Sequence, residues 1–316
     1  MIAFVIRRLI QTIPVIVGVT LVTFLLTRIL PGDLADVLLG PTASEEARQQ
    51  LRAAMGLDRS LLVQYGSYVL QLLHGDLGQS LVFARPVGQV LAGRLANTAL
   101  LALSAIVLSS VLGIAIGTWV ALRPGSPRDH ALSVAVLFLN SMPPFWLGLI
   151  LILAFALQLG WLPASGMGSA VGGGGIGDLL AHMVLPTLTL AAWSLAIITR
   201  MTRSALLDVI DSDFIRTARS RGLSESRIIL RHALPNALPP IITVIGLQAG
   251  FLLSGAVLTE TVFSWPGIGL AMYQGISARD IPFIQGGILL LALIFVLVNF
   301  AVDALYAYVN PKIELQ

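Results

Sequence analysis

Six apolar runs long enough to cross a lipid bilayer constrain this chain more than any other feature of its sequence. A spanning helix needs about 20 apolar residues, because the hydrocarbon core is about 30 Å thick and a helix rises about 1.5 Å per residue. The mean hydropathy of +0.89 and the 11% of charged residues exclude a water-soluble globule of 316 residues. We therefore expect an all-α membrane protein with spans at about Leu9–Ile29, Asn97–Leu122, Ala131–Leu159, Met183–Ile198, Leu238–Leu258 and Ile281–Val302.

The distribution of basic residues predicts how these spans are oriented. Lys and Arg of short loops stay on the cytoplasmic side of a membrane. With the N-terminus inside, the short outer loops keep only Arg279, and the segment 30–96 is too long for the rule to apply. We expect both termini in the cytoplasm, together with Arg7, Arg8, Arg123, Arg128, Lys312 and the seven arginines between Arg200 and Arg231.

The long segment after the first span carries signals for two short external helices. Thr42 and Glu45 have the spacing of a capping box, and Gly56 follows as a C-terminal stop. Ser60 is placed to cap a second helix that ends before Gly75. Two roles stay open for this segment, a packed cap and a surface that recognises a partner.

The residue types needed for catalysis are missing or scattered. A P-loop needs a lysine beside its glycines, and the only lysine is Lys312 in "NPKIEL". The chain has no cysteine, and its histidines do not have the spacing of a metal site. Its basic residues are not interleaved with aromatic ones, as a nucleic-acid surface requires. We expect no enzyme activity, no bound cofactor, no metal site and no nucleic acid partner in this chain.

A few polar residues lie in or near the apolar runs. A proton-coupled transporter carries a carboxylate deep within a span, and the predicted spans hold none. Two interpretations stay open for the polar residues, hydrogen bonds between helices and the lining of a transport path. The candidates are Asn140, Gln248, Glu260, Asn299 and Asp303.

The arginine-rich segment after the fourth span predicts an elbow of two short helices. Asp213 is placed to cap a helix that runs to Arg221, and Gly222 suits a left-handed stop. Ser224 is placed to cap a second helix that ends before Pro235. A general excess of positive charge on the inner side explains the arginines but not this fixed turn.

The elbow resembles the EAA loop in permease subunits of binding-protein-dependent ABC importers, whose pattern is E-A-A-x-x-x-G-x(9)-I-x-L-P. Ala218, Gly222, Leu234 and Pro235 match this pattern at the right spacing. Arg216, Thr217 and His232 depart from it at the Glu, first Ala and Ile positions.

Four further stretches resemble the dipeptide, oligopeptide and nickel branch of these permeases, and in particular the first of its two paired membrane subunits. They are "MGLDRSLLVQYGSYVLQLLHGDLGQS" (55–80), "SMPPFWLGLIL" (141–151), "VLTETVFSWPGIG" (257–269) and "RDIPFIQGG" (279–287). With the elbow they make five motifs in the family's order, spread over nearly the whole chain.

The resemblance implies one transmembrane domain over 1–316 with the type I ABC importer permease fold, in a bacterial inner membrane. It implies that the external segment 30–96 helps to receive a substrate-binding protein and that the loop 200–236 docks on an ATPase, with Arg216, Ala218, Gly222, Leu234 and Pro235 in the coupling contact. ATP and Mg²⁺ are then bound by two partner ATPase subunits, and a second permease completes the path. Short peptides are the expected cargo. Nickel or a small ligand such as glutathione is the alternative, and a secondary transporter or channel is the alternative of another class.

Overall fold

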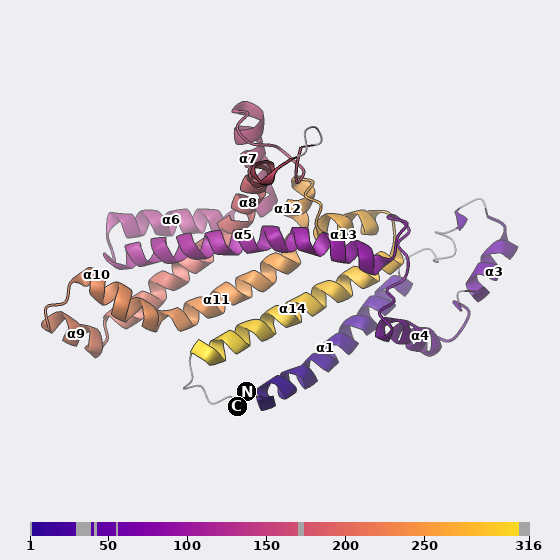
Figure 1. Ribbon diagram of the computed structural model, residues 1–316, viewed down its shortest axis with the longest axis horizontal. Coiled ribbons are helices and arrows are strands. Elements are labelled where there is room, and N and C mark those ends of the chain that lie inside the picture. Colours follow the sequence, from indigo (N-terminus) through magenta and orange to yellow (C-terminus); the bar gives the residue numbers. More distant parts are fainter. Residues whose placement is uncertain (1, 30–38, 41–42, 55, 170–173, 310–316) are drawn as a thin grey trace. The chain divides into compact units, whose positions relative to one another are not determined.

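The computed structural model describes residues 2–29, 39–40, 43–54, 56–169 and 174–309, and most of them are helical (Figure 1). An antiparallel bridge between Gln79 and Pro86 is the only β-type pairing in the part of the chain that the structure describes. The chain divides into two compact units. The first holds 1–96 and 270–296, and the second holds 97–269 and 297–316.

The first unit joins the N-terminal helices to the beginning of the last helix. It contains α1 (Ile2–Ile29), α3 (Glu45–Ala54), α4 (Leu61–Leu73), the start of α5 (Val87–Ala121), most of α13 (Ile268–Ser277) and the first half of α14 (Ile281–Val309). Helix α4 packs on α1 through Phe24, whose ring centroid lies 5.5 Å from that of Tyr65 and 6.1 Å from that of Tyr68. The hydroxyl of Tyr65 also lies 3.0 Å from that of Thr20.

A residue with a buried carboxylate, Asp280, precedes the first turn of α14 within this unit. The side chain of Asp280 is fully buried and accepts hydrogen bonds from the Ser80 hydroxyl at 2.5 Å and from the Val82 amide at 3.0 Å. It also accepts from the amide of Phe283 in the first turn of α14, at 3.2 Å, as an N-capping aspartate does. The segment after α4 is therefore fastened to the start of α14.

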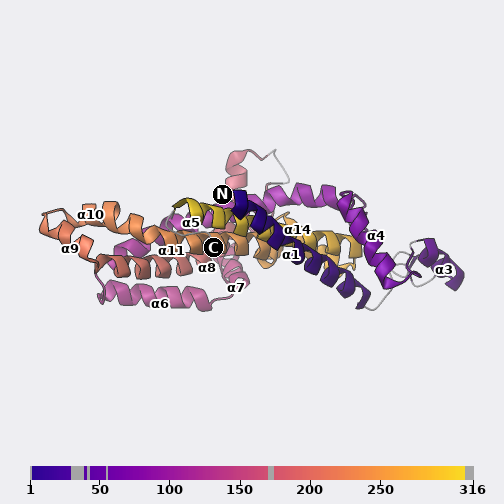
Figure 2. The same cartoon turned by 90° about the horizontal axis from the view of Figure 1, so that it is seen from below.

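The second unit is a helical bundle built around α8. It contains the rest of α5, α6 (Pro127–Ser141), α7 (Pro144–Leu151), the π-helix η1 (Ile152–Gln158), α8 (Ile176–Ile210), α11 (Leu234–Gly255) and α12 (Val257–Val262). Helix α8 packs between α6 and α11 (Figure 2). The core of this bundle includes Leu101, Ala105, Ile198, Leu252 and Trp265, all almost completely buried.

The number of spans is the least settled part of the sequence prediction. By length and composition, four helical stretches of the described residues can cross a membrane, Val87–Ala121, Ile176–Ile210, Glu225–Leu253 and Ile281–Val302. A fifth is counted where a bent helix pair is taken as one span. Within α1, the apolar stretch Ile10–Leu25 falls short of that length. The predicted total of six therefore stays a prediction.

The third predicted span, 131–159, is wrong as one straight helix. Helix α6 ends at Ser141, and the chain resumes as α7 and η1 after a bend of 100°. The physical reason is the pair Pro143–Pro144, since a residue before proline is driven out of the helical conformation and Met142 has an extended ψ of 124°. The fourth predicted span, 183–198, lies within α8, whose helix begins at Ile176 and continues to Ile210.

The two short helices predicted after the first span are confirmed as α3 and α4, and their external position stays a prediction. Gly56 and Gly75 follow their ends with φ of +66° and +76°, the left-handed conformation that ends many helices. Ser60 occupies the N-cap of α4, but its side chain makes no capping hydrogen bond. Thr42 lies outside the described residues, and the hydroxyl that accepts from the first turn of α3 belongs to Ser44, at 3.3 Å from the Ala47 amide.

Candidate coupling site

The arginine-rich segment forms a helical elbow at one end of α8 and α11 (Figure 1). Its elements are α9 (Asp213–Ser220), α10 (Glu225–Ile228) and the π-helix η2 (Ile229–Ala233). Gly222 lies in the turn with φ of +75°, the left-handed conformation that the sequence predicted. No atom lies within 4 Å of the place where a Cβ would stand at this glycine. Gly222 is therefore required by the backbone conformation and not by lack of space.

The start of the elbow differs from the sequence prediction. Ser212 occupies the N-cap of α9, and Asp213 is the first helical residue. The Ser212 hydroxyl donates to the carbonyl of Val209 at 2.5 Å, so it does not cap the helix that follows. The helix also ends one residue early, at Ser220.

The end of the elbow differs more. A stop before Pro235 was expected, yet α10, η2 and α11 follow one another without a break. The Leu234 amide donates to the Ile229 carbonyl with the wide spacing of a π-helix, and Pro235 follows at the second position of α11. The second arm of the elbow therefore continues directly into the fifth predicted span.

A small apolar core fixes the elbow to the bundle. Ile215 of α9 and Ile228 of α10 are fully buried and belong to one cluster with Leu206 of α8 and Ile241 of α11. Among the predicted coupling residues, Ala218 and Leu234 pack against this cluster. The elbow is thus held against α8 and α11 by close packing.

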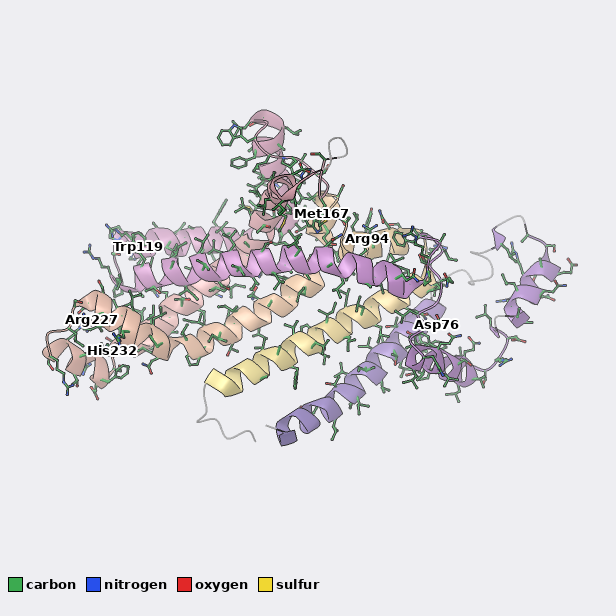
Figure 3. The ribbon with its side chains drawn as sticks, viewed as in Figure 1. Asp76, Arg94, Trp119, Met167, Arg227 and His232 are labelled. Atoms are coloured by element: carbon green, nitrogen blue, oxygen red, sulfur yellow. The ribbon has the colours of Figure 1, made fainter. Side chains whose placement is uncertain are left out.

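The outer surface of the elbow is cationic with two apolar side chains. Arg219 bonds Glu225 at 2.8 and 3.3 Å, which joins α9 to α10 across the turn. Phe214 and Leu230 are 47% and 64% exposed. The remaining side chains at this surface include exposed Arg216, Arg221, Arg227, Arg231 and Pro235, and Figure 3 labels Arg227 and His232 there. Arg216 lies 3.5 Å from the exposed carboxylate of Asp213.

The polar residues that the sequence singled out lie in different environments in the structure. Gln248 on α11 accepts a hydrogen bond from Ser194 on α8 at 3.0 Å, a contact between helices. The side-chain oxygen of Asn140 is buried at the end of α6 and has no partner in the part of the chain that the structure describes. Asn299 is partly buried on α14, and the side chain of Asp303 lies outside the described residues.

Glu260 is the centre of a buried hydrogen-bond network that joins α5 to the segment after α12. Its fully buried carboxylate accepts from the Thr98 hydroxyl at 2.7 Å, and that hydroxyl accepts from the Ile268 amide at 2.8 Å. Next to it, the Asn97 side chain donates to the carbonyl of Pro266 at 2.8 Å. The arrangement supports a structural role for Glu260 over one in a transport path.

Comparison with known proteins decides the family. The family model described as "Binding-protein-dependent transport system inner membrane component" matches residues 113–315, and the model of the corresponding N-terminal part matches residues 1–102. The chain belongs to this family. It is therefore a multi-pass inner membrane component of an importer and not an enzyme, as the sequence resemblance implied.

Relatives that match over nearly their full length are named for the cargo they transport. The di/tripeptide transport system permease protein DppB of Pseudomonas aeruginosa is 43% identical over 100% of both chains. The dipeptide transport system permease protein DppB of Escherichia coli K12 is 41% identical, and the glutathione transport system permease protein GsiC of Salmonella choleraesuis is 39% identical, each over 99% of both chains.

A solved structure supports the fold of this permease chain. An inward-facing form of the MetNI methionine ABC transporter superposes with a TM-score of 0.57 over 70% of this chain and 97% of the other, at 23% identity. At that identity the likeness supports the type I importer permease fold alone.

One contact of this permease was missed by the sequence reasoning. Arg203 of α8 binds Asp129 at the start of α6. Ser126 and Asp129 have the spacing of a capping box, and the Ser126 hydroxyl accepts from the Asp129 amide at 3.4 Å. That pattern predicts the helix start but gives no sign of the arginine, which lies 74 residues away in the sequence.

Proposed function

We propose that this chain is one of two membrane subunits of an ATP-driven importer of short peptides and forms half of its translocation path. The observation that carries the proposal is the set of relatives matched over 99–100% of their length, which are named for dipeptides, di- and tripeptides, and glutathione. All three cargo names denote short peptides. Glutathione itself is the second candidate cargo, favoured by the 39% identity to GsiC.

The elbow is proposed to be the contact with the ATPase that powers import. Its outer surface offers exposed Phe214 and Leu230 beside exposed arginines, and its inner surface is packed against α8 and α11. Apolar anchors surrounded by charge are typical of a specific protein interface. A push on this surface would be passed to both helices of the bundle.

The proposed assembly contains a second, homologous permease, two ATPase subunits that bind ATP and Mg²⁺, a substrate-binding protein outside and the surrounding lipid. The arginines between Arg200 and Arg231 support an elbow on the cytoplasmic side, and with six spans we propose that both termini are cytoplasmic as well. A single cysteine at Ser224 should then be labelled only from inside, and one at Gln50 only from outside. Labelling of Ser224 from outside contradicts this orientation.

Uptake measured in cells lacking this chain tests the cargo. Radiolabelled dipeptides, tripeptides, glutathione and nickel are supplied separately, and the gene is then restored. We expect dipeptide and tripeptide uptake to depend on the gene. Dependence of glutathione uptake alone supports the second candidate, and dependence of nickel uptake alone overturns the proposal.

A further inference from the structure

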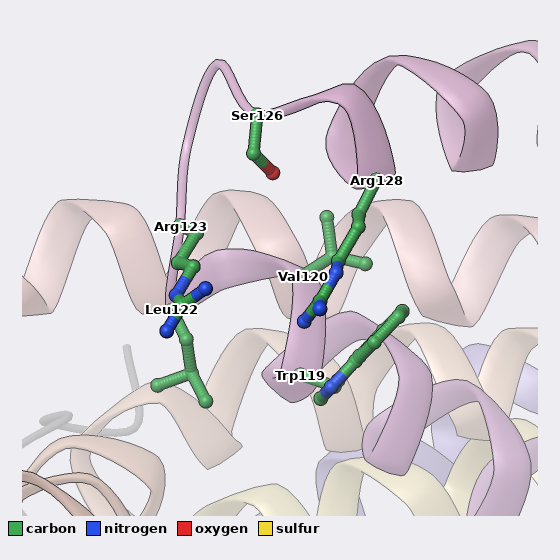
Figure 4. A pocket seen from close by; sticks show the side chains of 6 residues that line it. All are labelled: Trp119, Val120, Leu122, Arg123, Ser126 and Arg128. Atoms are coloured by element: carbon green, nitrogen blue, oxygen red, sulfur yellow. The ribbon is translucent and has the colours of Figure 1, made fainter.

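A pocket of about 170 Å³ lies where α5 passes into α6 (Figure 4). It belongs wholly to the second unit and is distant in sequence from the elbow. Its lining combines two cationic side chains with an indole, a hydroxyl and aliphatic groups. The lining residues are Trp119, Val120, Leu122, Arg123, Ser126 and Arg128.

The charge of this pocket is not neutralised. Arg123 and Arg128 flank it and are both exposed, and neither pairs with a carboxylate among the residues that the structure describes (Figure 4). The guanidinium of Arg128 lies over the Trp119 ring, 5.1 Å from its centroid. The neighbouring acid, Asp129, is occupied by Arg203 and by the Gly125 amide. The pocket therefore offers two cations to an anion from outside the chain.

Exposed apolar side chains lie at the edge of the pocket and farther along both helices. Trp119 and Leu122 at its edge are 52% and 46% exposed. Leu112 on α5 and Val134 and Phe138 on α6 are also exposed, at 40%, 67% and 63%. A ligand that fits both features carries an anionic head and an apolar tail.

We propose that this pocket binds an anionic phospholipid of the cytoplasmic leaflet. The phosphodiester would lie between Arg123 and Arg128, and an acyl chain would follow the apolar side chains of α5 and α6. Basic residues beside the cytoplasmic leaflet attract anionic lipids, and tryptophan is enriched at the level of the headgroups. The assignment to the cytoplasmic leaflet rests on the orientation of the chain given under the proposed function. The labelling of a cysteine at Ser224 tests that orientation separately.

Lipid binding to the intact importer tests the proposal. The complex is purified with its accompanying subunits into phosphatidylcholine nanodiscs, and bound phosphatidylglycerol is counted by native mass spectrometry. The double variant Arg123→Gln/Arg128→Gln should bind phosphatidylglycerol about 30-fold more weakly, since each basic residue near a membrane surface contributes on the order of 1 kcal/mol. Phosphatidylcholine binding should not change.

Two matched variants separate a site from a general loss of charge. Arg123→Lys/Arg128→Lys keeps both charges and should stay within about threefold of the wild type, because a lysine still binds phosphate as a point charge. Arg59→Gln/Arg85→Gln removes two exposed arginines of the first unit and should have no effect.

Four results overturn the proposal. They are an unchanged affinity for phosphatidylglycerol, an equal loss for both lipids, an equal loss in the Arg59/Arg85 control, and displacement of the lipid by millimolar inorganic phosphate, which indicates a site for soluble phosphate. If the double variant loses its ATPase subunits during purification while its lipid binding is unchanged, the turn between α5 and α6 is a protein interface instead. The single variant Arg123→Gln provides the same measurement if the double variant fails to assemble.

Discussion

Arg203 on α8 binds Asp129 at the start of α6 through two parallel hydrogen bonds, from Nε to Oδ1 at 2.6 Å and from Nη2 to Oδ2 at 2.7 Å. The Gly125 amide donates to the same carboxylate at 2.9 Å. The turn between α5 and α6 is therefore fastened to α8, and α8 leads directly into the elbow. This contact connects the proposed lipid pocket to the proposed coupling site through one continuous helix.

Removal of this ion pair should destabilise the protein. Asp129 is 4% exposed, so Arg203→Gln leaves a buried carboxylate without its cation, at a cost of about 2 kcal/mol. Thermal unfolding of the purified protein in detergent measures the loss. Arg219→Gln is the matched control, because its partner Glu225 is 60% exposed and surface pairs contribute less than about 1 kcal/mol. Equal losses in both variants contradict the prediction.

The sequence was sufficient for features that depend on local chemistry. The apolar runs predicted α5 and α14, because the bilayer sets how long such helices must be. Gly222 was expected to be left-handed and Gly56 to stop a helix, and both have a positive φ, since glycine adopts this conformation at little steric cost.

Features that depend on distant partners were not predictable in this way. Thr98 and Glu260 are separated by 162 residues, and no periodicity relates them. The length of α8 could not be predicted for a different reason, since the apolar run 183–198 marks a span but does not show how far the helix continues beyond the membrane. The apolar residues on both sides of Pro143 concealed the bend there.

Close packing of α5 on α8 predicts a difference between two glycines of the same helix. A Cβ at Gly117 would lie 2.7 Å from the Thr199 carbonyl oxygen and from Thr202 Cβ, whereas nothing lies within 4 Å of the same position at Gly93. Gly117→Ala should lower the free energy of unfolding by about 1–3 kcal/mol through overpacking. Gly93→Ala should raise it by up to about 1 kcal/mol, because alanine favours helix. Thermal unfolding of both variants decides, and a loss at Gly93 as large as at Gly117 contradicts this account.

The hydroxyl of Thr98 is expected to contribute more to the stability of the protein than the shape of the threonine side chain. It donates to Glu260 and accepts from the Ile268 amide, so Thr98→Val leaves both groups without this partner while keeping the volume. We expect a loss of about 2 kcal/mol in the free energy of unfolding. Thr98→Ser keeps the hydroxyl and should lose less than half as much. A serine variant as unstable as the valine variant shows that the methyl group, and not the network, is important.

Two tyrosines of α4 should respond in opposite directions. Tyr68→Phe removes a buried hydroxyl that has no partner among the described residues, and should stabilise the protein by about 1 kcal/mol. Tyr65→Phe removes the hydrogen bond to Thr20 and should destabilise it by about the same amount. Thermal unfolding at neutral pH compares the two, and stabilisation by both substitutions sinks the assignment of the Tyr65 bond.

Tyr68 should also make the stability of the protein depend on pH. Burial and the neighbouring Tyr65 raise the pKa of Tyr68 to about 12 from 10.0. Because the folded state holds this proton more tightly than the unfolded state, the associated stability is fully present below pH 10 and is lost as the pH rises towards 12. Tyr68→Phe should reduce the loss of stability over this window. An unchanged alkaline loss in the variant assigns it to another group.

Strain at Gly222 should separate coupling from folding. With φ of +75° and open space around its Cα, the position rejects a side chain only through the backbone. The valine introduced by Gly222→Val is β-branched and disfavours a positive φ. The asparagine introduced by Gly222→Asn is of similar size but tolerates a positive φ. ATP-driven peptide uptake should therefore fall about tenfold or more in the valine variant, since strain of this kind costs about 1–3 kcal/mol. The asparagine variant should keep most of its uptake, and both proteins should reach the membrane in normal amounts. Full uptake by a well-expressed valine variant means that the left-handed turn, which holds α9 and α10 at their fixed angle, is not required for coupling.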